Sequence, residues 1–163
     1  MLNDETNPDF SEQDLVDCSR GYGNQGCNGG WMDSAFEYIQ DNGIASQDDY
    51  PYTARDGVCQ SKSRTHSGID YVDTPGCDNL DNALSERPIA VAVDASNWSS
   101  YRSGVLSICN KNVNHGVLLV GANDSNYKIK NSWGQGWGES GYIRITRGDT
   151  CAICEFPSYP TLE

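Results

Sequence analysis

Basic residues are scarce in this chain of 163 residues, where 11 Lys and Arg stand against 23 Asp and Glu, for a net charge of -12. This charge repels phosphate backbones and anionic lipid headgroups at neutral pH, so we expect neither nucleic acid nor a membrane as a partner. An acidic compartment would suit such a surface because protonation lowers its self-repulsion, but solubility alone also explains it.

Long apolar runs are also missing, since none approaches the roughly 20 residues that a membrane-spanning helix needs. The stretch from Met1 to Phe10 is acidic and polar, unlike a signal peptide, so we expect the chain to be a piece of something longer. No internal repeat or low-complexity segment is present. With 37% hydrophobic residues and 17 glycines spread along it, the chain has a globular composition.

Cysteine, by contrast, is abundant, which suggests disulfides made in an oxidising compartment. Because the number of cysteines is seven, one thiol is left unpaired. A metal or redox protein is the competing class, because Cys151 and Cys154 form a C-x-x-C pair, but structural zinc needs four ligands and no second such pair occurs. We therefore expect no metal and no cofactor. The seven cysteines are Cys18, Cys27, Cys59, Cys77, Cys109, Cys151 and Cys154.

Two tripeptides match the acceptor pattern for N-linked glycosylation, beginning at Asn97 and at Asn123. Such patterns arise often by chance. They would be used only if the chain entered a eukaryotic secretory route.

The first half of the chain, up to about Tyr71, favours short helices and glycine-rich loops. Residues 11–14 form a capping-box pattern that opens a short helix ending at Cys18. Residues 27–30 predict a flexible loop, and residues 31–42 an amphipathic helix that Gly43 ends. Its apolar stripe contains Met32, Ala35, Phe36 and Ile39, of which we expect the last three to pack in the core, while the roles of Trp31 and Met32, beside two glycines, stay open.

The second half favours strands of a barrel-like sheet. Asp78 is expected to cap a short helix through Leu84, and Pro88 to stop it before a strand at 89–93. Residues 116–122 read as a buried strand, 123–126 as a turn and 127–131 as its partner strand, followed by another strand at 141–147.

A hairpin turn centred near Asn123 would place His115 directly opposite Asn131. Opposed side chains stand about 5 Å apart at Cβ, within hydrogen-bonding reach of an imidazole and a carboxamide. Without other support, a structural histidine beside an asparagine would be the preferred interpretation.

Support comes from the residues around this pair: residues 113–116 lead into an apolar strand, and residues 130–134 are followed by the tryptophan- and glycine-rich residues 136–142. These segments resemble the papain family of cysteine peptidases, closest to its cathepsin L-like branch. The resemblance implies an α+β, papain-like two-lobe fold, with residues 1–71 as part of a helical lobe and 72–163 as an antiparallel β-barrel-like lobe. It spans nearly the whole chain in the right order. The matching segments are residues 11–18, 26–30, 50–52, 113–116, 130–134, 136–142 and 157–160.

The resemblance also implies catalytic roles. His115 matches the base that takes the proton of a cysteine thiol and later gives it to the leaving amine. Asn131 matches the residue whose amide oxygen orients that ring, and Trp133 the indole that shields their hydrogen bond from water.

Substrate contacts are implied in the same way. Gly29 and Gly30 match glycines whose backbone binds the peptide as an added strand. Phe156, at the floor of the main pocket, should favour apolar side chains. The remaining matched positions are Trp31, Met32, Ala92, Val113, Asn114, Gly116 and, on the leaving-group side, Trp137.

The family's nucleophile segment, Cys-Gly-Ser/Ala-Cys-Trp/Tyr, does not occur in this sequence. Family spacing would put it roughly 15 to 35 residues before Met1. The resemblance therefore implies an N-terminally truncated chain that also lacks the oxyanion-hole glutamine and the central helix. Three explanations stay open: another chain supplies the missing part, the part was left out of this sequence, or the gene lacks it.

The family's disulfides imply pairs between Cys18 and Cys59 and between Cys109 and Cys151. Family topology further brings Cys77 toward Cys154. Cys27 is left as the orphan, because its family partner lies just before the nucleophile.

We therefore expect a cysteine-type endopeptidase acting on peptide or protein substrates, with this chain inactive alone. A separate N-terminal chain or a propeptide-like inhibitor is an expected partner, and the location is expected to be lysosomal, vacuolar or extracellular. The alternative is a non-catalytic relative that binds peptides or proteins in the same cleft.

Overall fold

The structure is a computed structural model that describes residues 8–162 and forms two compact units. The first contains the described residues up to Tyr71 together with the segment from Pro160, and the second contains Val72–Tyr159. The last described residues of the chain thus belong to the first unit, although they follow the second in sequence. Most of the acidic stretch Met1–Phe10 lies outside the described residues.

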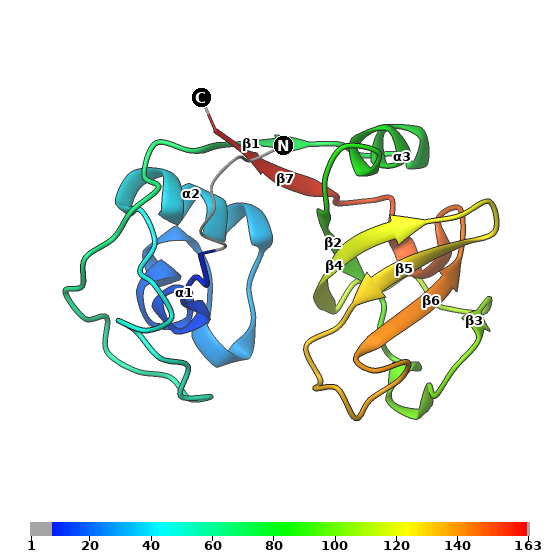
Figure 1. Ribbon diagram of the computed structural model, residues 1–163, viewed down its shortest axis with the longest axis horizontal. Coiled ribbons are helices and arrows are strands. Elements are labelled where there is room, and N and C mark those ends of the chain that lie inside the picture. The colour runs from blue at the N-terminus through cyan, green and yellow to red at the C-terminus, as the bar shows by residue number, and fades with distance from the viewer. Residues whose placement is uncertain (1–7, 163) are drawn as a thin grey trace. The chain divides into compact units, whose positions relative to one another are not determined.

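The first unit is built from short helices (Figure 1). The predicted cap is confirmed, because the Ser11 hydroxyl accepts a hydrogen bond of 3.0 Å from the Asp14 amide. The expectation of an irregular loop at 27–30 was wrong in part, since a short 3₁₀ helix includes Cys27 and Asn28. The helices are α1 (Glu12–Cys18), η1 (Ser19–Tyr22), η2 (Gly26–Asn28) and α2 (Met32–Asn42).

Helix α2 ends where predicted, with Gly43 at φ 74°, a backbone conformation that glycine adopts without strain. Its apolar stripe is less buried than expected, because Ala35, Phe36 and Ile39 are partly exposed and the buried side chain of this helix is Tyr38. The interpretation of the stripe as ordinary core was therefore too simple.

Polar side chains replace much of an apolar core in the first unit. The carboxylate of Asp14, fully buried, accepts hydrogen bonds from the Ala45 amide, the Tyr38 hydroxyl and, through both oxygens, the Arg64 guanidinium. Burial, and then the Asp14 charge, raise the pKa of Tyr38 to about 12, so the phenol remains a donor. One carboxylate thus joins α1 to α2 and to two later segments.

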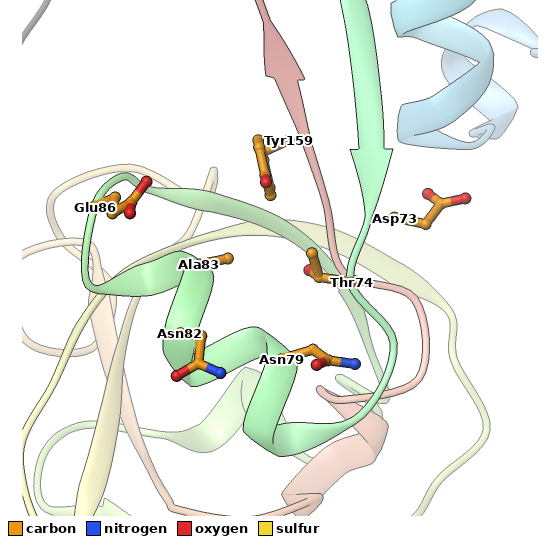
Figure 2. A pocket seen from close by; sticks show the side chains of 7 residues that line it. All are labelled: Asp73, Thr74, Asn79, Asn82, Ala83, Glu86 and Tyr159. Carbon is orange, nitrogen blue, oxygen red and sulfur yellow. The ribbon is translucent and has the colours of Figure 1, made fainter.

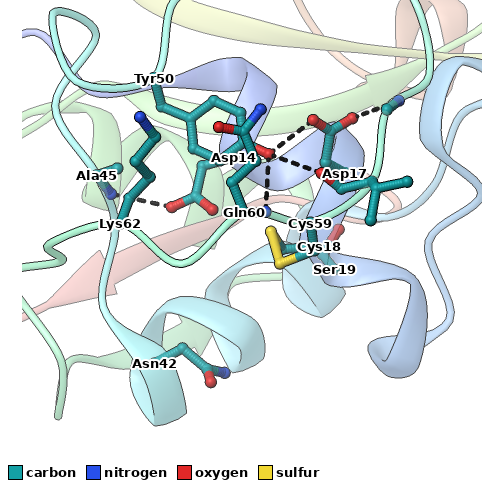
Figure 3. The surroundings of a disulfide bond; sticks show 12 residues. Asp14, Asp17, Cys18, Ser19, Asn42, Ala45, Tyr50, Cys59, Gln60 and Lys62 are labelled. Carbon is teal, nitrogen blue, oxygen red and sulfur yellow. Dashed lines mark hydrogen bonds between the residues drawn. A yellow bond between two sulfur atoms is a disulfide. The ribbon is translucent and has the colours of Figure 1, made fainter.

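Asp17, one turn further along α1, also joins this helix to later segments of the chain. It accepts hydrogen bonds from the Gln13 amide nitrogen at 2.9 Å, the Tyr50 hydroxyl at 2.7 Å and the Gly57 amide at 2.7 Å. The Cys18–Cys59 disulfide lies beside these contacts, as Figure 3 shows. The exposed segment 51–60 is therefore held to α1 by a covalent bond as well as by polar ones.

The second unit contains most of a seven-stranded sheet in the order β1-β7-β2-β4-β5-β6-β3. Neighbours with assigned direction are antiparallel except β3 and β6, which run parallel, so the expected all-antiparallel lobe needs this correction. The strands are β1 (Asp70–Asp73), β2 (Ile89–Val93), β3 (Val105–Leu106), β4 (His115–Ala122), β5 (Asn126–Lys130), β6 (Tyr142–Thr146) and β7 (Ser158–Thr161).

Helices and turns complete this unit. The expected cap at Asp78 was wrong, because helix α3 already begins at Cys77 with Gly76 at the N-cap, and Asp78 lies in its first turn. The buried strand expected at 116–122 instead alternates, with Val117 and Leu119 facing the core. The remaining elements are α3 (Cys77–Leu84), η3 (Trp98–Ser100) and η4 (Thr150–Ala152).

One apolar cluster forms the core of the second unit, including Leu80 of α3, Ile89 of β2 and Ile129 of β5, none of them exposed. Disulfides join Cys77 to Cys154 and Cys109 to Cys151, the pairs that the family resemblance implied. Within residues 8–162, no helix is long and apolar enough to cross a membrane.

Glu139 holds together three segments of this unit. Its carboxylate accepts hydrogen bonds from the Arg144 guanidinium at 2.8 and 2.7 Å and from the Gly104 amide at 2.9 Å. The Arg144 hydrogen bonds, followed by that of Gly104, lower the pKa of Glu139 to about 2. The segment before β6 is thereby attached both to β6 and to the turn before β3.

Replacing Asp14 by alanine should lower the free energy of unfolding by about 3–5 kcal/mol, because it leaves Arg64 and two other donors without their buried acceptor. Urea denaturation measures this loss. The control is Arg20→Gln, which breaks the Arg20–Asp56 pair, about half exposed, and should cost no more than about 1 kcal/mol. Equal losses in the two variants would contradict this account.

Glu139→Gln should destabilise the protein in a pH-dependent way. The pKa of Glu139 falls from an ordinary 4.5 to about 2 on folding, so its stabilisation is complete above the ordinary value and lost as pH falls through about 2. Denaturation curves of wild type and variant at several pH values should differ near neutrality and converge near pH 2. For the control Glu86→Gln, which alters an exposed pair with Arg87, we expect a small difference throughout. A gap for Glu139→Gln that persists at pH 2 would overturn this assignment.

Candidate functional site

His115 and Asn131 form the centre of the candidate site in the second unit. The distance from His115 Nε2 to Asn131 Oδ1 is 2.8 Å. The pairing is shifted from direct opposition, as a turn centre slightly after Asn123 would produce, because Leu118 pairs with Lys130, so Val117 rather than His115 is level with Asn131. The two residues are diagonal neighbours on one face, which still allows side chains of this length to meet.

The hydrogen-bonding pattern fixes which nitrogen of His115 carries a proton. The Ser132 amide donates to Asn131 Oδ1 at 2.8 Å, so the atom facing Nε2 must be the carboxamide oxygen, an acceptor. Nε2 is therefore the donor. In the neutral ring Nδ1 then holds a free lone pair, and Nδ1 has no hydrogen-bond partner among the described residues.

Indole rings surround the histidine. Trp133 stacks on the His115 ring with centroids 5.2 Å apart and an interplanar angle of 27°. Trp133 itself remains 42% exposed, so it forms an outer cover over a hydrogen bond whose Asn131 side lies buried. A cover of this kind excludes water and strengthens the bond by lowering the local dielectric.

Trp98 is a site residue that sequence reasoning missed. Its ring is fully buried and lies edge-on to His115, with centroids 6.3 Å apart at 90°. It follows β2 after a short turn, and no local pattern shows that this turn reaches His115.

Trp137 packs against the tryptophans that contact His115. Its indole N–H donates to the Trp98 carbonyl at 3.1 Å, and its ring contacts both Trp98 and Trp133. The sequence predicted Trp137 as a substrate contact, and the structure leaves it 9% exposed. Most of its surface therefore packs inside the unit.

The predicted pocket residues of the second unit gather partly around the histidine. Ala92 pairs with Gly116 and Val93 with His115 in the β2–β4 ladder, and Val113 and Asn114 lead into β4. Asn114 accepts a hydrogen bond from the Ala95 amide and donates to the Ser96 hydroxyl, which ties the end of β2 to the start of β4. Phe156, 45% exposed, lies in the segment between η4 and β7.

Gly30, predicted to bind substrate through its backbone, belongs to the first unit. A Cβ there would lie 2.0 Å from Asn24 Oδ1, which accepts a hydrogen bond from the Trp31 amide. A side chain at this position would displace the Asn24 carboxamide and its hydrogen bond to the Trp31 amide. The backbone groups of Gly30 have no partner among the described residues, whereas the Gly29 carbonyl already accepts from the Gln25 amide.

The other predicted contacts of the first unit are Trp31 and Met32, at the N-cap and start of α2. Trp31 is exposed and Met32 partly exposed. Cys27 is nearby in sequence, is free and exposed, and its pKa is raised by desolvation and then by the Asp56 carboxylate. A thiol with a raised pKa is a poor nucleophile at neutral pH.

The described residues contain no cluster of three or more His, Cys, Asp or Glu that could hold a metal ion. A pocket of about 460 Å³ occurs elsewhere in the second unit, between α3, β1 and β7 (Figure 2). Polar side chains such as Asn79, Asn82 and Glu86 line it, and none of the predicted site residues does.

These contacts give an imidazole with a fixed tautomer, an oriented ring and aromatic shielding. Such a group accepts a proton at Nδ1 while the Asn131 oxygen stabilises the imidazolium that forms. It is equipped to activate a thiol or hydroxyl brought to Nδ1.

Known proteins are similar to this chain in sequence and in fold. The family model described as papain family cysteine protease matches residues 1–161. Cathepsin L 2 of Paramecium tetraurelia is 59% identical over 157 residues, which cover 94% of this chain and 50% of that protein. The chain thus spans about half the length of this curated relative.

Solved structures agree. Digestive procathepsin L 3 of the Tenebrio molitor larval midgut superposes with a TM-score of 0.86 at 42% identity, covering 95% of this chain and 56% of that one. A Carica candamarcensis cysteine protease in complex with E-64 gives a TM-score of 0.84 at 32% identity, covering 94% and 78%. With a family model that spans nearly all of its residues, the chain belongs to the papain family of cysteine proteases.

Proposed function

We propose that the protein containing this chain is a cysteine endopeptidase, in which His115 acts as general base and acid. The observation that carries the proposal is the hydrogen bond between His115 Nε2 and the Asn131 carboxamide oxygen. It leaves Nδ1 as the basic nitrogen and holds the ring in one orientation. A histidine that served packing alone would need neither.

The chemistry follows from this polarity. Nδ1 takes the proton of a cysteine thiol, and the thiolate attacks the peptide carbonyl carbon. The imidazolium then gives this proton to the leaving amine as the carbon–nitrogen bond breaks, and a water activated by the same nitrogen hydrolyses the thioester. The thiol is assigned to residues outside this chain, since the pKa of Cys27, the free cysteine of the described residues, is raised.

Substrate binding is assigned to backbone and apolar groups. The free N–H and C=O of Gly30 suit main-chain pairing with an extended peptide. The exposed ring of Phe156 suits a bulky apolar side chain two places before the scissile bond. Gly29, Trp31, Met32, Ala92, Val113, Asn114, Gly116 and Trp137 complete the proposed substrate contacts.

The disulfides and the similar structures indicate where the protein works and what it binds. The three disulfides favour an oxidising compartment, which is consistent with a lysosomal, vacuolar or extracellular protein. A procathepsin among the similar structures supports a propeptide-like inhibitor as a partner, beside peptide or protein substrates.

A non-catalytic peptide-binding relative is the second candidate. It is favoured by the free backbone groups of Gly30 and the exposed ring of Phe156, which would serve binding as well as cleavage. The residue that the gene encodes in the nucleophile position discriminates the two. Cysteine there supports the peptidase, and any other residue supports the binding protein.

Removing the dyad from the full-length gene product tests the peptidase. His115→Ala should lower kcat/KM for a fluorogenic dipeptide by about 10²–10⁴-fold, the usual contribution of a general base. Asn131→Ala should cost roughly tenfold to a hundredfold, since one orienting hydrogen bond is lost. Asn79→Ala, in the unrelated pocket, is the control and should leave the rate unchanged. A His115→Ala variant with full activity would refute the assignment.

This chain by itself, residues 1–163, should cleave the same dipeptide only at the background rate, because it contains no thiol with a lowered pKa. The measurement compares the isolated chain with the full-length product, each with and without a thiol-alkylating epoxide. Turnover by the isolated chain that the epoxide blocks would contradict the assignment of the nucleophile to other residues.

A further inference from the structure

The turn between β4 and β5 carries a modification pattern that the proposed peptidase chemistry does not use. Asn123, Asp124 and Ser125 form an Asn-x-Ser tripeptide, and all three residues are exposed. A tripeptide of this kind is an acceptor for N-linked glycans when it meets the transferase of the secretory route.

Hydrogen bonds hold this turn in one conformation. The Asn123 carboxamide oxygen accepts from the Ser125 amide at 2.9 Å, the Ser125 hydroxyl at 3.1 Å and the Asn126 amide at 2.9 Å. Arg147 donates from its guanidinium to the Asn123 carbonyl at 3.0 Å. The oxygen is thus occupied inside the turn, while Nδ2 has no partner among the described residues.

We propose that Asn123 carries an N-linked glycan in the protein made by a eukaryotic secretory route. The co-reactant is a polyprenyl-diphosphate-linked oligosaccharide. A bond forms between Asn123 Nδ2 and the anomeric carbon of the first sugar, and the bond from that carbon to the diphosphate oxygen breaks. The diphosphate leaves with the electron pair, and Nδ2 loses one proton.

The folded protein accommodates a glycan at this position. Nδ2 makes no contact that the sugar would displace, and the hydrogen bonds of the turn use the oxygen instead. β4 runs for 8 residues from His115 to Ala122, so the turn lies about 25 Å from the dyad. A bulky glycan therefore leaves the dyad accessible.

The three disulfides provide an independent link to the same compartment. Cys18–Cys59, Cys77–Cys154 and Cys109–Cys151 form in the oxidising environment in which the transferase works. Neither the acceptor tripeptide nor the disulfides depend on whether the protein cleaves peptides. The glycan proposal and the peptidase proposal can therefore fail independently.

The second tripeptide, Asn97-Trp98-Ser99, differs in its surroundings. Its central residue is the fully buried Trp98 whose ring contacts His115, and the preceding Ser96 is bonded to Asn114. A glycan at Asn97 would begin next to the dyad. Asn97 therefore serves as the natural control within the same chain.

The experiment expresses the full-length gene product in a eukaryotic secretory host and maps its peptides by mass spectrometry before and after an amidase that releases N-glycans. Release converts a glycosylated Asn to Asp, which marks the site. The variants are Asn123→Gln, Ser125→Ala and the conservative Ser125→Thr, with Asn97→Gln as the matched control. Ser125→Ala keeps Asn123 and its backbone-donated hydrogen bonds, so it separates loss of the acceptor pattern from loss of the turn.

We expect a released glycan at position 123 in the wild type, in Ser125→Thr and in Asn97→Gln, and none there in Asn123→Gln or Ser125→Ala. An unmodified Asn123 in the wild type, when a reference glycoprotein from the same cells is fully modified, would overturn the proposal. Conversion of Asn123 to Asp by the amidase in Ser125→Ala would overturn the proposal too. The dipeptide assay on the same samples reports the peptidase independently.

Discussion

The hydrogen bond between His115 and Asn131 depends on the antiparallel pairing of β4 with β5, and the chemistry of the site depends on that bond. Strand periodicity places His115 on the same face as Val117 and Leu119, whose side chains are buried in the core of the second unit. The dyad thus stands at the end of a packed face, where a side chain is positioned by the core and still open at one nitrogen.

The two units obtain their stability in different ways. The second unit has a continuous apolar core, and its dyad is an extension of that core through Trp98 and Trp137. The first unit instead depends on buried carboxylates, with Asp14 and Asp17 each satisfied by several donors. A polar core of this kind is sensitive to the loss of any one partner, because each remaining group would be buried without a hydrogen bond.

The hairpin separates two tasks along its length. At one end Ser132 and Asn131 fix the proton on the imidazole, and shielding by Trp133 protects that bond. At the other end the turn at Asn123 is exposed and held by Arg147. Since a β-strand is stiff over this distance, a modification of the turn need not disturb the dyad.

The sequence by itself predicted the three α-helices, the strands β2, β4, β5 and β6, and the identity of the pair. Local signals predicted the cap at Ser11, the end of α2 at Gly43 and the strand at 89–93, because capping, glycine backbone freedom and β-branched runs act over a few residues. A two-residue alternation also predicted that His115 and Asn131 share a face.

Only the tertiary structure decided the rest. The hairpin register differs from direct opposition because Ala122 pairs with Tyr127, which centres the turn between Asp124 and Ser125 instead of near Asn123. A bulge between Leu119 and Gly121 then changes the register by one residue, and no local pattern sets a bulge. The contact of Trp98 with His115 and the attachment of Arg64 to Asp14 join residues far apart in the chain. Such contacts are fixed by how whole elements pack, so they cannot be read from the residues beside them.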